Sequence, residues 1–338
     1  MERHVGDQQM NQRPAIEDNQ IELVAIVNSF NRRQLLERAI KSLTDSLRTA
    51  RFRWAVVVFE ANSDDGSAEY LKAWRENNPG DNFFVIQASS EHHSFSDGVN
   101  EACAFAIARF PNCRWLFLYE TDNYLMNIGP LEKAISLLEL EPQLAAAGFT
   151  VKKYDGSFFG YGMRFPSTLS FALGQNLAGL YHLHAPNNSG WRTREGIRWR
   201  TFDVVFTSPL LVRRQAWKQS NGFDAANFPF SDSDLDWAWR CFRLGWKMAV
   251  IASEEVIHDN LEQLSAWSAN RVLDFHRNRF RLLKRHRGKY VGLLKPILFL
   301  RHALEAMLLK RSSRLDPAAT EKLAKRKQMV RTVWSDYC

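Results

Sequence analysis

The 338-residue chain is 45% hydrophobic and 12% aromatic, a composition that can bury a large core and excludes intrinsic disorder over most of its length. Its formal net charge of +8 is uneven, because residues 271–338 hold 18 Lys and Arg against 5 Asp and Glu while the remainder is acidic overall. Four cysteines without metal-ligand spacing exclude a disulfide framework and favour a reducing compartment.

Residues 1–20 are polar and lack an apolar core, so we expect a flexible arm and neither a signal peptide nor a membrane anchor. Short apolar runs then alternate with helical patterns such as "RRQLLERAIKSLTDSL". This alternation predicts βαβ units and a mostly parallel sheet covered by helices on both faces. The predicted strands are 21–27, 54–59, 82–88 and 114–119.

The second half of the chain is less regular. An aromatic, Gly-rich region covers residues 154–200, where Tyr181, Trp191 and Trp199 could stack on sugars but are more typical of packing. It is followed by "FDVVFTSPLLVRR", a helix predicted over 234–246, and "KMAVIAS", which predicts another strand.

Polar segments follow three of the predicted strands: "NSFNRR", "EANSDDGS" and "ETDN". In an open parallel sheet these segments lie at one edge, outside the carboxyl ends of the strands, where ligands bind. The alternative is that Asp, Asn, Ser and Gly occur there only because turns favour them.

The order of these segments resembles the GT-A-fold family 2 glycosyltransferases, especially the bacterial rhamnosyltransferase-like branch that builds cell-surface polysaccharides. "VVVFEANSDDGS" is similar to V-V-D-N-x-S-x-D-G-S, and "LFLYETDN" is similar to the strand ending in D-x-D. "FDVVFTSPLLVRRQAWKQSNGFD" and "SDLDWAWRCFRLGWKMAVIASEEVIH" resemble the later R-R-x-A-F, G-G-F-D and E-D-x-D-L-x-W-R stretches with a terminal His. The resemblance covers roughly residues 21–290.

The resemblance implies an α/β GT-A fold, a Rossmann-like, mostly parallel sheet flanked by helices. We expect the catalytic domain over residues 21–260, with a nucleotide-binding half (21–125) and an acceptor-side half (126–260), followed by a basic helical extension (261–338). The implied activity is an inverting transfer of a sugar from a nucleotide-diphosphate donor to a glycan or lipid-linked glycan acceptor.

The resemblance also implies donor-binding residues. Glu60 stands where the family has an Asp that contacts the nucleotide base, and Ser29 and Asn31 occupy the turn that lines the base and ribose. Asp97 either approaches the nucleotide or caps the following helix, and capping is the favoured reading. Thr207 lies where the family has a small pair beside the donor sugar.

A divalent cation, Mn²⁺ or Mg²⁺, is implied as the cofactor that neutralises the leaving diphosphate. Asp122 is the first candidate ligand, with Glu120 facing the ribose or reaching the metal through water. His258 is a further candidate at the position of the family's terminal His. Glu120 could instead be a solvated loop acid, and His258 a plain surface or packing residue.

The segment "SDSDLDW" supplies the candidate catalytic carboxylates. Asp234 stands where the family has its general base, Asp236 would orient the acceptor or the helix, and Asp232 is a rival base. All three also suit a helix N-terminus, where acidic side chains cap the backbone and favour the helix dipole.

The basic tail includes a helix with one apolar side. This side comprises Leu293, Ile297, Leu300, Leu304, Met307 and Leu308. Such a helix suits an anionic membrane surface, and equally packing on the catalytic domain or in a homo-oligomer. No nucleic-acid recognition motif accompanies the charge. We therefore expect a cytoplasmic protein that is peripheral on the inner membrane face.

An alternative from another class is a catalytically silent relative that binds carbohydrate or organises an assembly complex. The departures from the family pattern keep this alternative open. They are Glu60, Glu120, Thr207 and Ser233.

Overall fold

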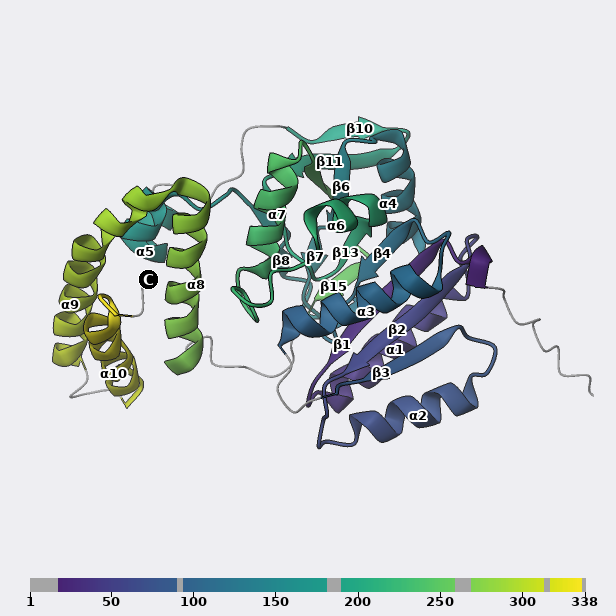
Figure 1. Ribbon diagram of the computed structural model, residues 1–338, viewed down its shortest axis with the longest axis horizontal. Helices are drawn as coiled ribbons and strands as arrows, with labels where there is room; N and C mark the ends of the chain where they lie inside the picture. Colours follow the sequence, from purple (N-terminus) through teal and green to yellow (C-terminus); the bar gives the residue numbers. More distant parts are fainter. Residues whose placement is uncertain (1–17, 90–93, 181–189, 259–268, 313–316, 336–338) are drawn as a thin grey trace, which may run out of the picture.

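The computed structural model describes residues 18–89, 94–180, 190–258, 269–312 and 317–335. Its centre is a nine-stranded sheet with the order β10-β11-β14-β6-β13-β4-β1-β2-β3, and helices cover both faces of that sheet (Figure 1). A short 3-10 helix, η1 (Asp18–Gln20), precedes the first strand. The rest of the predicted N-terminal arm lies outside the described residues.

The half of the sheet built from the N-terminal segments is entirely parallel. Its strands are β1 (Leu23–Ser29), β2 (Trp54–Glu60), β3 (Phe83–Gln87) and β4 (Trp115–Leu118). All four were predicted from continuous apolar runs, and their ends agree with the predicted ranges to within two residues. β3 and β4 are each one residue shorter at both ends than predicted. Their carboxyl ends lie along one edge of the sheet.

The other half mixes strand directions. Its strands are β6 (Leu144–Phe149), β10 (Arg192–Arg194), β11 (Ile197–Phe202), β13 (Leu210–Arg213) and β14 (Lys247–Ile251). β13 runs antiparallel to both of its neighbours, β4 and β6, while β14 is parallel to β6. The sheet is therefore entirely parallel on the side of β1 to β4 and mixed on the other side.

Successive residues along β1 enter opposite halves of the core. Val24 and Ile26 pack on one side of the sheet, and Leu23, Ala25 and Val27 pack on the other. Because both faces of the strand are buried, its sequence is continuously apolar rather than alternating.

The helices form two layers on the sheet. On one face lie α1 (Arg33–Leu47), α2 (Ser67–Asn77) and α4 (Gly129–Leu140). On the other face lie α3 (Phe95–Arg109), α6 (Arg214–Ser220) and α7 (Ser233–Arg243). α3 approaches the sheet closely at Gly98, where a Cβ atom would lie 2.7 Å from both Asn28 and Phe59.

Two small sheets extend the edge where β4 ends. One contains β5 (Asn123–Leu125), β15 (Val256–His258), β7 (Val151–Lys152) and β8 (Phe158–Gly160). The other contains β9 (Gly162–Met163) and β12 (Val204–Val205). β15 pairs with β5 so that His258 lies opposite Asn123, which brings the end of the sheet domain back to the segment after β4.

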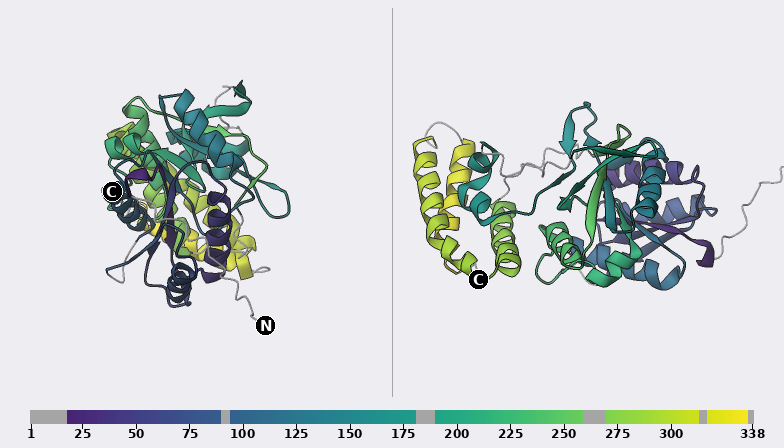
Figure 2. Two further views of the ribbon diagram at one scale, coloured as in Figure 1. Left: turned by 90° about the vertical axis from the view of Figure 1, so that its right-hand side faces the viewer. Right: turned by 90° about the horizontal axis from the view of Figure 1, so that it is seen from above.

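A helical lobe lies beside the sheet domain (Figures 1 and 2). It is built from α5 (Thr168–Leu180), α8 (Ala269–Arg287), η2 (Lys289–Leu294), α9 (Lys295–Ser312) and α10 (Pro317–Thr332). α5 belongs to the lobe although its sequence lies between strands of the sheet domain, and it packs against α9. Within the described parts of the chain, no helix has the length and apolarity that crossing a bilayer requires.

Candidate functional site

The predicted donor-side residues lie where β1, β2 and β4 end. Ser29 and Glu60 are the last residues of β1 and β2 and face each other in the parallel register. Glu120 lies two residues after the end of β4, and Asp122 directly precedes β5. This edge is the one at which ligands bind in open parallel sheets.

Glu60 is fully buried, and its carboxylate already has three hydrogen-bond donors. It accepts from the backbone N–H groups of Asn62 at 3.0 Å and Ser63 at 2.9 Å, and from Nε2 of Gln87 at 2.7 Å. Glu60 thereby fixes the start of the "SDDGS" loop, a structural task that the sequence did not indicate.

Asn31 holds the same loop from the β1 side. Its backbone N–H donates to Oγ of Ser63 at 3.0 Å, and its Oδ1 accepts from the N–H of Asp64 at 2.9 Å. Its φ of 48° lies in the left-handed region, which Asn tolerates better than most residues. The hydroxyl of the neighbouring Ser29 is buried and has no hydrogen-bond partner among the described residues.

Asp97 caps α3. Its N–H donates to Oγ of Ser94 at 3.1 Å, while its carboxylate accepts from the N–H of Ser94 at 3.2 Å, which is a complete capping box. The sequence left two interpretations of Asp97, a contact with the nucleotide or a helix cap, and the structure shows the helix cap.

Asp122, His258 and Ser208 form a polar cluster beside this edge. Oδ1 of Asp122 lies 3.3 Å from Nδ1 of His258, and its Oδ2 lies 3.5 Å from Nη1 of Arg32. Nδ1 of His258 is also within hydrogen-bond distance of Oγ of Ser208 (3.0 Å) and Oδ1 of Asn123 (3.1 Å). Three segments distant in sequence thus meet around Asp122, at Arg32, Ser208 and His258. Of these three residues, the sequence had indicated only His258 as a site residue.

Glu120 and Thr207 share the wall of a cavity of about 200 Å³. Oγ1 of Thr207 donates to Oε1 of Glu120 at 2.8 Å. The cavity lining also includes His258 and Ser208, whose peptide bond to Pro209 is cis. The remaining lining residues are Phe149, Val151, Gly160, Tyr161, Phe206 and Pro209. Three predicted site residues therefore border one mainly apolar space.

The Glu120 carboxyl titrates unusually. Burial raises its pKa to about 7, with a further contribution from the negative charges of Asp122 and Asp234. The hydrogen bond from Thr207 and the charge of Arg32 oppose this rise. The charge of Asp234, at the start of α7, thus acts on Glu120 after the end of β4.

The three acids at the start of α7 have different surroundings. Asp232 is buried and accepts two hydrogen bonds from Arg279 of α8, at 2.9 Å and 3.0 Å. Asp236 is fully buried and accepts from Nε of Arg240 at 2.7 Å and from Nε2 of His286 at 2.8 Å. Both carboxylates are therefore neutralised by cationic or imidazole donors.

Asp234 has no such partner among the residues that the structure describes. Its carboxylate is half-buried and accepts from the N–H of the adjacent Leu235 at 2.9 Å. Burial raises the pKa of Asp234 to about 6, and the charge of Asp232 adds to the rise, while Arg279 lowers it. For Asp236, burial also favours the neutral form, but hydrogen bonding to His286 and the charge of Arg240 leave its pKa below the usual value.

The sequence did not predict the partners of these acids. Arg279, His286 and Arg285 belong to α8, and Arg285 forms ion pairs with Asp224 and Asp236. The excess of basic residues in the tail was the only signal, and it did not specify which of them pair. Arg32 was visible in "NSFNRR", but nothing in its spacing indicated a contact with Asp122.

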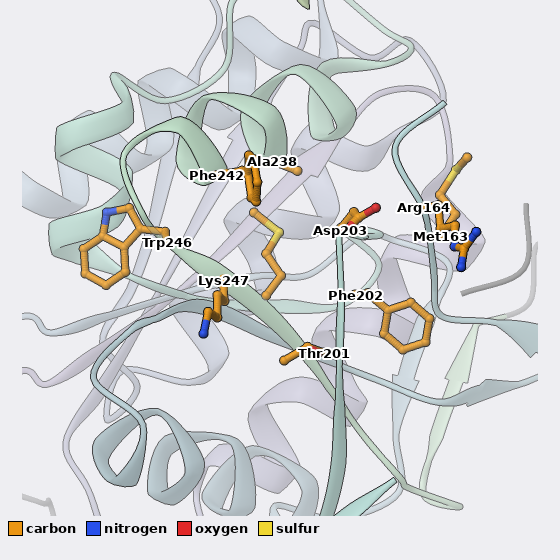
Figure 3. Close-up of a pocket in the computed structure, with 10 residues that line it drawn as sticks. Met163, Arg164, Thr201, Phe202, Asp203, Ala238, Phe242, Trp246 and Lys247 are labelled. Atoms are coloured by element: carbon orange, nitrogen blue, oxygen red, sulfur yellow. The ribbon is translucent and has the colours of Figure 1, made fainter. Parts of the chain in front are cut away.

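A second cavity, of about 230 Å³, lies beside α7 and contains none of the predicted site residues (Figure 3). Its lining includes Phe242 and Trp246 together with Arg164, Asp203 and Lys247. Asp203 is engaged locally, because its Oδ2 accepts from the N–H of Phe165 at 3.0 Å.

Of the aromatic residues in the Gly-rich region, Tyr161 lines the first cavity, whereas Trp191 and Trp199 do not. Trp199 is buried within β11, and Trp191 contacts the ring of Tyr161 at a centroid distance of 6.3 Å. Tyr181 lies outside the described residues.

Asp122 and His258 present side-chain atoms that could bind a divalent cation. Oδ1 of Asp122 is buried and has no hydrogen-bond partner in the described part of the chain, and an imidazole nitrogen lies 3.3 Å from it. Carboxylate oxygen and imidazole nitrogen are suitable ligands for Mn²⁺. Over the same residues no cluster of three His, Cys, Asp or Glu side chains is close enough to hold an ion alone. The residues fit a site that a ligand's oxygens would complete.

Comparisons with a family model and with curated proteins both identify glycosyltransferases as similar to this chain. The model of the glycosyltransferase-like family 2 matches residues 21–274. An N-acetylglucosaminyl-diphospho-decaprenol L-rhamnosyltransferase from two strains of Mycobacterium tuberculosis is 25% identical over 186 residues, which are 55% of this chain. The chain spans 60% of the length of these curated relatives.

Two solved structures share the fold. A mannosyltransferase from Pyrobaculum calidifontis in complex with GDP-Man and Mn²⁺ has a TM-score of 0.55 at 16% identity, over 95% of this chain and 83% of that one. A structure of GalNAc-T7 with UDP, GalNAc and Mn²⁺ has a TM-score of 0.54 at 10% identity, over 79% of this chain and 48% of that one. The predicted GT-A architecture is confirmed.

Proposed function

Because the chain belongs to the glycosyltransferase-like family 2, we propose that it moves a sugar, with inversion, from a nucleotide-diphosphate donor to a glycan or lipid-linked glycan acceptor. The observation that carries the proposal is the contrast among the three acids of α7. Asp232 and Asp236 are held in ion pairs, whereas Asp234, whose charge acts on Glu120, has no cationic partner in the described part of the chain.

Asp234 is the general base in this proposal. It removes the proton from the acceptor hydroxyl as that oxygen forms a bond to the anomeric carbon of the donor sugar. The bond from that carbon to the diphosphate breaks on the opposite face, and the nucleotide diphosphate leaves with the electron pair. A pKa raised to about 6 keeps Asp234 largely ionised at neutral pH and makes it a stronger base than an ordinary Asp.

Asp232 and Asp236 hold that base in place. Asp232 is the first residue before α7 and is bound to Arg279, while Asp236 is bound to Arg240 within α7 and to His286 of α8. These contacts fix the first turn of α7 from both sides. A rigid support of this kind keeps a base within reach of its proton.

On the donor side, Asp122 and His258 would hold a divalent cation, Mn²⁺ or Mg²⁺, together with oxygens of the diphosphate. The bound cation would offset the negative charge that develops on the departing diphosphate. Arg32, 3.5 Å from Asp122, supplies a positive charge of this chain at the same place. Ser29, Asn31, Glu60 and Glu120 lie along the strand ends, where we place the nucleoside.

The curated relatives support the proposed acceptor class. The name of these relatives specifies an acceptor sugar carried on a lipid diphosphate and the transfer of an L-rhamnosyl group. We extend the lipid-linked acceptor, but not the identity of the transferred sugar, to this chain, with a role in cell-surface polysaccharide synthesis. The proposal places the reaction in the cytoplasm at the inner membrane face, where a soluble nucleotide sugar meets such an acceptor.

One observation favours the alternative of a silent relative. Glu60, which stands where the family contacts the nucleotide base, already accepts three hydrogen bonds within the protein. A site that cannot bind the base would retain the fold without the reaction, and the protein would then act as a carbohydrate-binding or assembly protein.

The test is a titration of several nucleotide sugars with and without Mn²⁺, followed by an assay for transfer to lipid-linked glycans and for release of free sugar. Asp234→Asn should bind donor as the wild type does but lose transfer by about 10² to 10⁴-fold. Asp274→Asn, at an exposed acid of α8, is the control and should transfer normally. Undiminished transfer by Asp234→Asn would exclude it as the base, and donor binding without any turnover would favour the silent relative.

A further inference from the structure

The outer side of α9 is apolar, and its inner side carries polar groups around the fully buried Leu298. Leu300 is 59% exposed and Leu308 is 63% exposed, and both lie on the row of side chains that the sequence indicated as one face. The other exposed members of this face are Ile297, Leu304 and Met307 of α9 and Leu293 of the preceding η2. We call these six residues the apolar face of α9.

The opposite side of α9 packs into the lobe through polar groups. His302 is fully buried, and its ring lies edge-on to that of His276 of α8 at 5.0 Å. Glu305 accepts from Nε of Arg326 of α10 at 2.8 Å, and Arg301 donates to the carbonyl oxygen of Ala172 of α5 at 3.0 Å. Apart from Leu298, which is buried in the core, most large apolar side chains of α9 therefore face away from the lobe, whereas the apolar side of a typical surface helix faces the core.

This orientation decides between two readings of the sequence. The apolar side does not pack on the catalytic domain within the described residues, because its members remain exposed. α9 lies on the side of the lobe away from the central sheet (Figures 1 and 2). A contiguous exposed apolar surface of this kind is typical of an interaction site.

The charge around the face identifies the partner. Residues 271–338 hold 18 Lys and Arg against 5 Asp and Glu. Arg311 follows Leu308 by three residues, and α10, which packs along α9, exposes Lys322, Lys327 and Arg331. A second copy of this chain on the same face would bring two strongly basic lobes together, which like-charge repulsion opposes. A surface of opposite charge, an anionic bilayer, fits both properties.

Aromatic side chains lie at the margin of the face. Tyr290 is 73% exposed, and Trp334 is 54% exposed and lies against Phe299 with ring centroids 6.4 Å apart. Tyr and Trp favour the headgroup region of a bilayer, because their rings are amphipathic.

We propose that the apolar face of α9, on a lobe that also exposes these basic side chains, docks the protein on an anionic lipid surface. This inference deepens the proposed function by naming the membrane contact, and it depends on that function only for the presence of a bilayer near the acceptor. α8 joins the two sites, because it packs on η2 and α10 at the lobe and binds Asp232 and Asp236 at the start of α7.

The experiment is flotation of the full-length protein with vesicles of phosphatidylcholine alone or of phosphatidylcholine mixed with phosphatidylglycerol. The wild type should bind the mixed vesicles and bind the neutral ones at least about tenfold more weakly, and raising the salt concentration should weaken binding. Leu300→Ser with Leu304→Ser should reduce binding to the mixed vesicles about tenfold or more, because each apolar side chain contributes on insertion.

The matched control is Met126→Ser with Leu244→Ser, two comparably exposed apolar residues of the sheet domain, which should bind as the wild type does. Circular dichroism checks that all variants fold. No binding by the wild type, equal binding to both vesicle types, or unchanged binding by the α9 variant would overturn the proposal. The proposal would also be overturned if neither the wild type nor the α9 variant binds vesicles and sedimentation velocity shows that the wild type is a dimer and the α9 variant is not. No sugar transfer is measured, so a failure here leaves the proposed reaction untouched.

Discussion

Arg279 of α8 donates two hydrogen bonds to Asp232, at 2.9 Å and 3.0 Å, and so ties the C-terminal helices to the helix that carries Asp234. Both partners are less than a tenth exposed. A paired, buried charge of this kind is costly to leave alone, because the remaining partner keeps its desolvation without its counter-charge.

We expect Arg279→Gln to lower the free energy of unfolding by about 3–5 kcal/mol, because it leaves Asp232 buried and unpaired. The double variant Arg279→Gln with Asp232→Asn should regain most of this loss, since neither charge remains. Denaturant unfolding of the two single variants and the double variant measures the coupling. Additive losses in the double variant would contradict the importance of the pair.

Transfer should depend on pH through Asp234. Because the base must be ionised and its pKa is about 6, kcat/KM should fall as the pH drops through about 6. Arg279 lowers that pKa, so the folded fraction of Arg279→Gln should show the fall at higher pH. A pH–rate profile of kcat/KM checks both shifts. If the pH–rate profile of Arg279→Gln matches that of the wild type, the group that titrates is not Asp234.

Glu120→Gln should stabilise the free protein at high pH. The pKa of Glu120 is raised from 4.5 to about 7 on folding, so its stabilising contribution is present below about pH 4.5 and is lost as the pH rises through 7. Gln keeps an oxygen for Thr207 but carries no charge. Since the residue is partly exposed, we expect a gain of about 1–2 kcal/mol at pH 8 and none below about pH 4.

Denaturant unfolding across this pH range measures the effect. Glu76→Gln, at an exposed Glu of α2, is the control and should be neutral throughout. A gain for Glu120→Gln that is the same at pH 4 and pH 8 would show that charge is not its cause.

Asp122→Asn should weaken the effect of Mn²⁺ on nucleotide binding. Asp122 supplies a buried oxygen that lacks a hydrogen-bond partner among the described residues, and an amide oxygen is a poorer ligand than a carboxylate for a hard cation. We expect nucleoside diphosphates to bind about tenfold or more weakly to Asp122→Asn with Mn²⁺ present and about equally without it. Titration calorimetry of GDP and UDP measures this, with Asp155→Asn, an exposed turn acid, as the control. An equal loss in both conditions would remove Asp122 from the metal site.

The strands were predictable because they are continuously apolar, and the site edge was predictable because turn residues with carboxylates follow them. The roles within "SDSDLDW" were not, because three acids within five residues look alike until their partners are known. Those partners, Arg279 and His286, lie about 50 residues further along the chain, and local sequence carries no signal for such pairing. The apolar side of α9 was likewise visible as a period, but a period does not say whether that side faces the core or the solvent.

The helical lobe draws on two distant stretches of sequence, since α5 leaves the sheet domain to pack against α9 before the chain returns to form β10. A shortened protein ending near residue 260 would still contain α5 but would lack η2 and α9, against which α5 packs. The two parts are thus interwoven rather than strung in series, and neither can be exchanged between relatives, or expressed as a fragment, by a single cut.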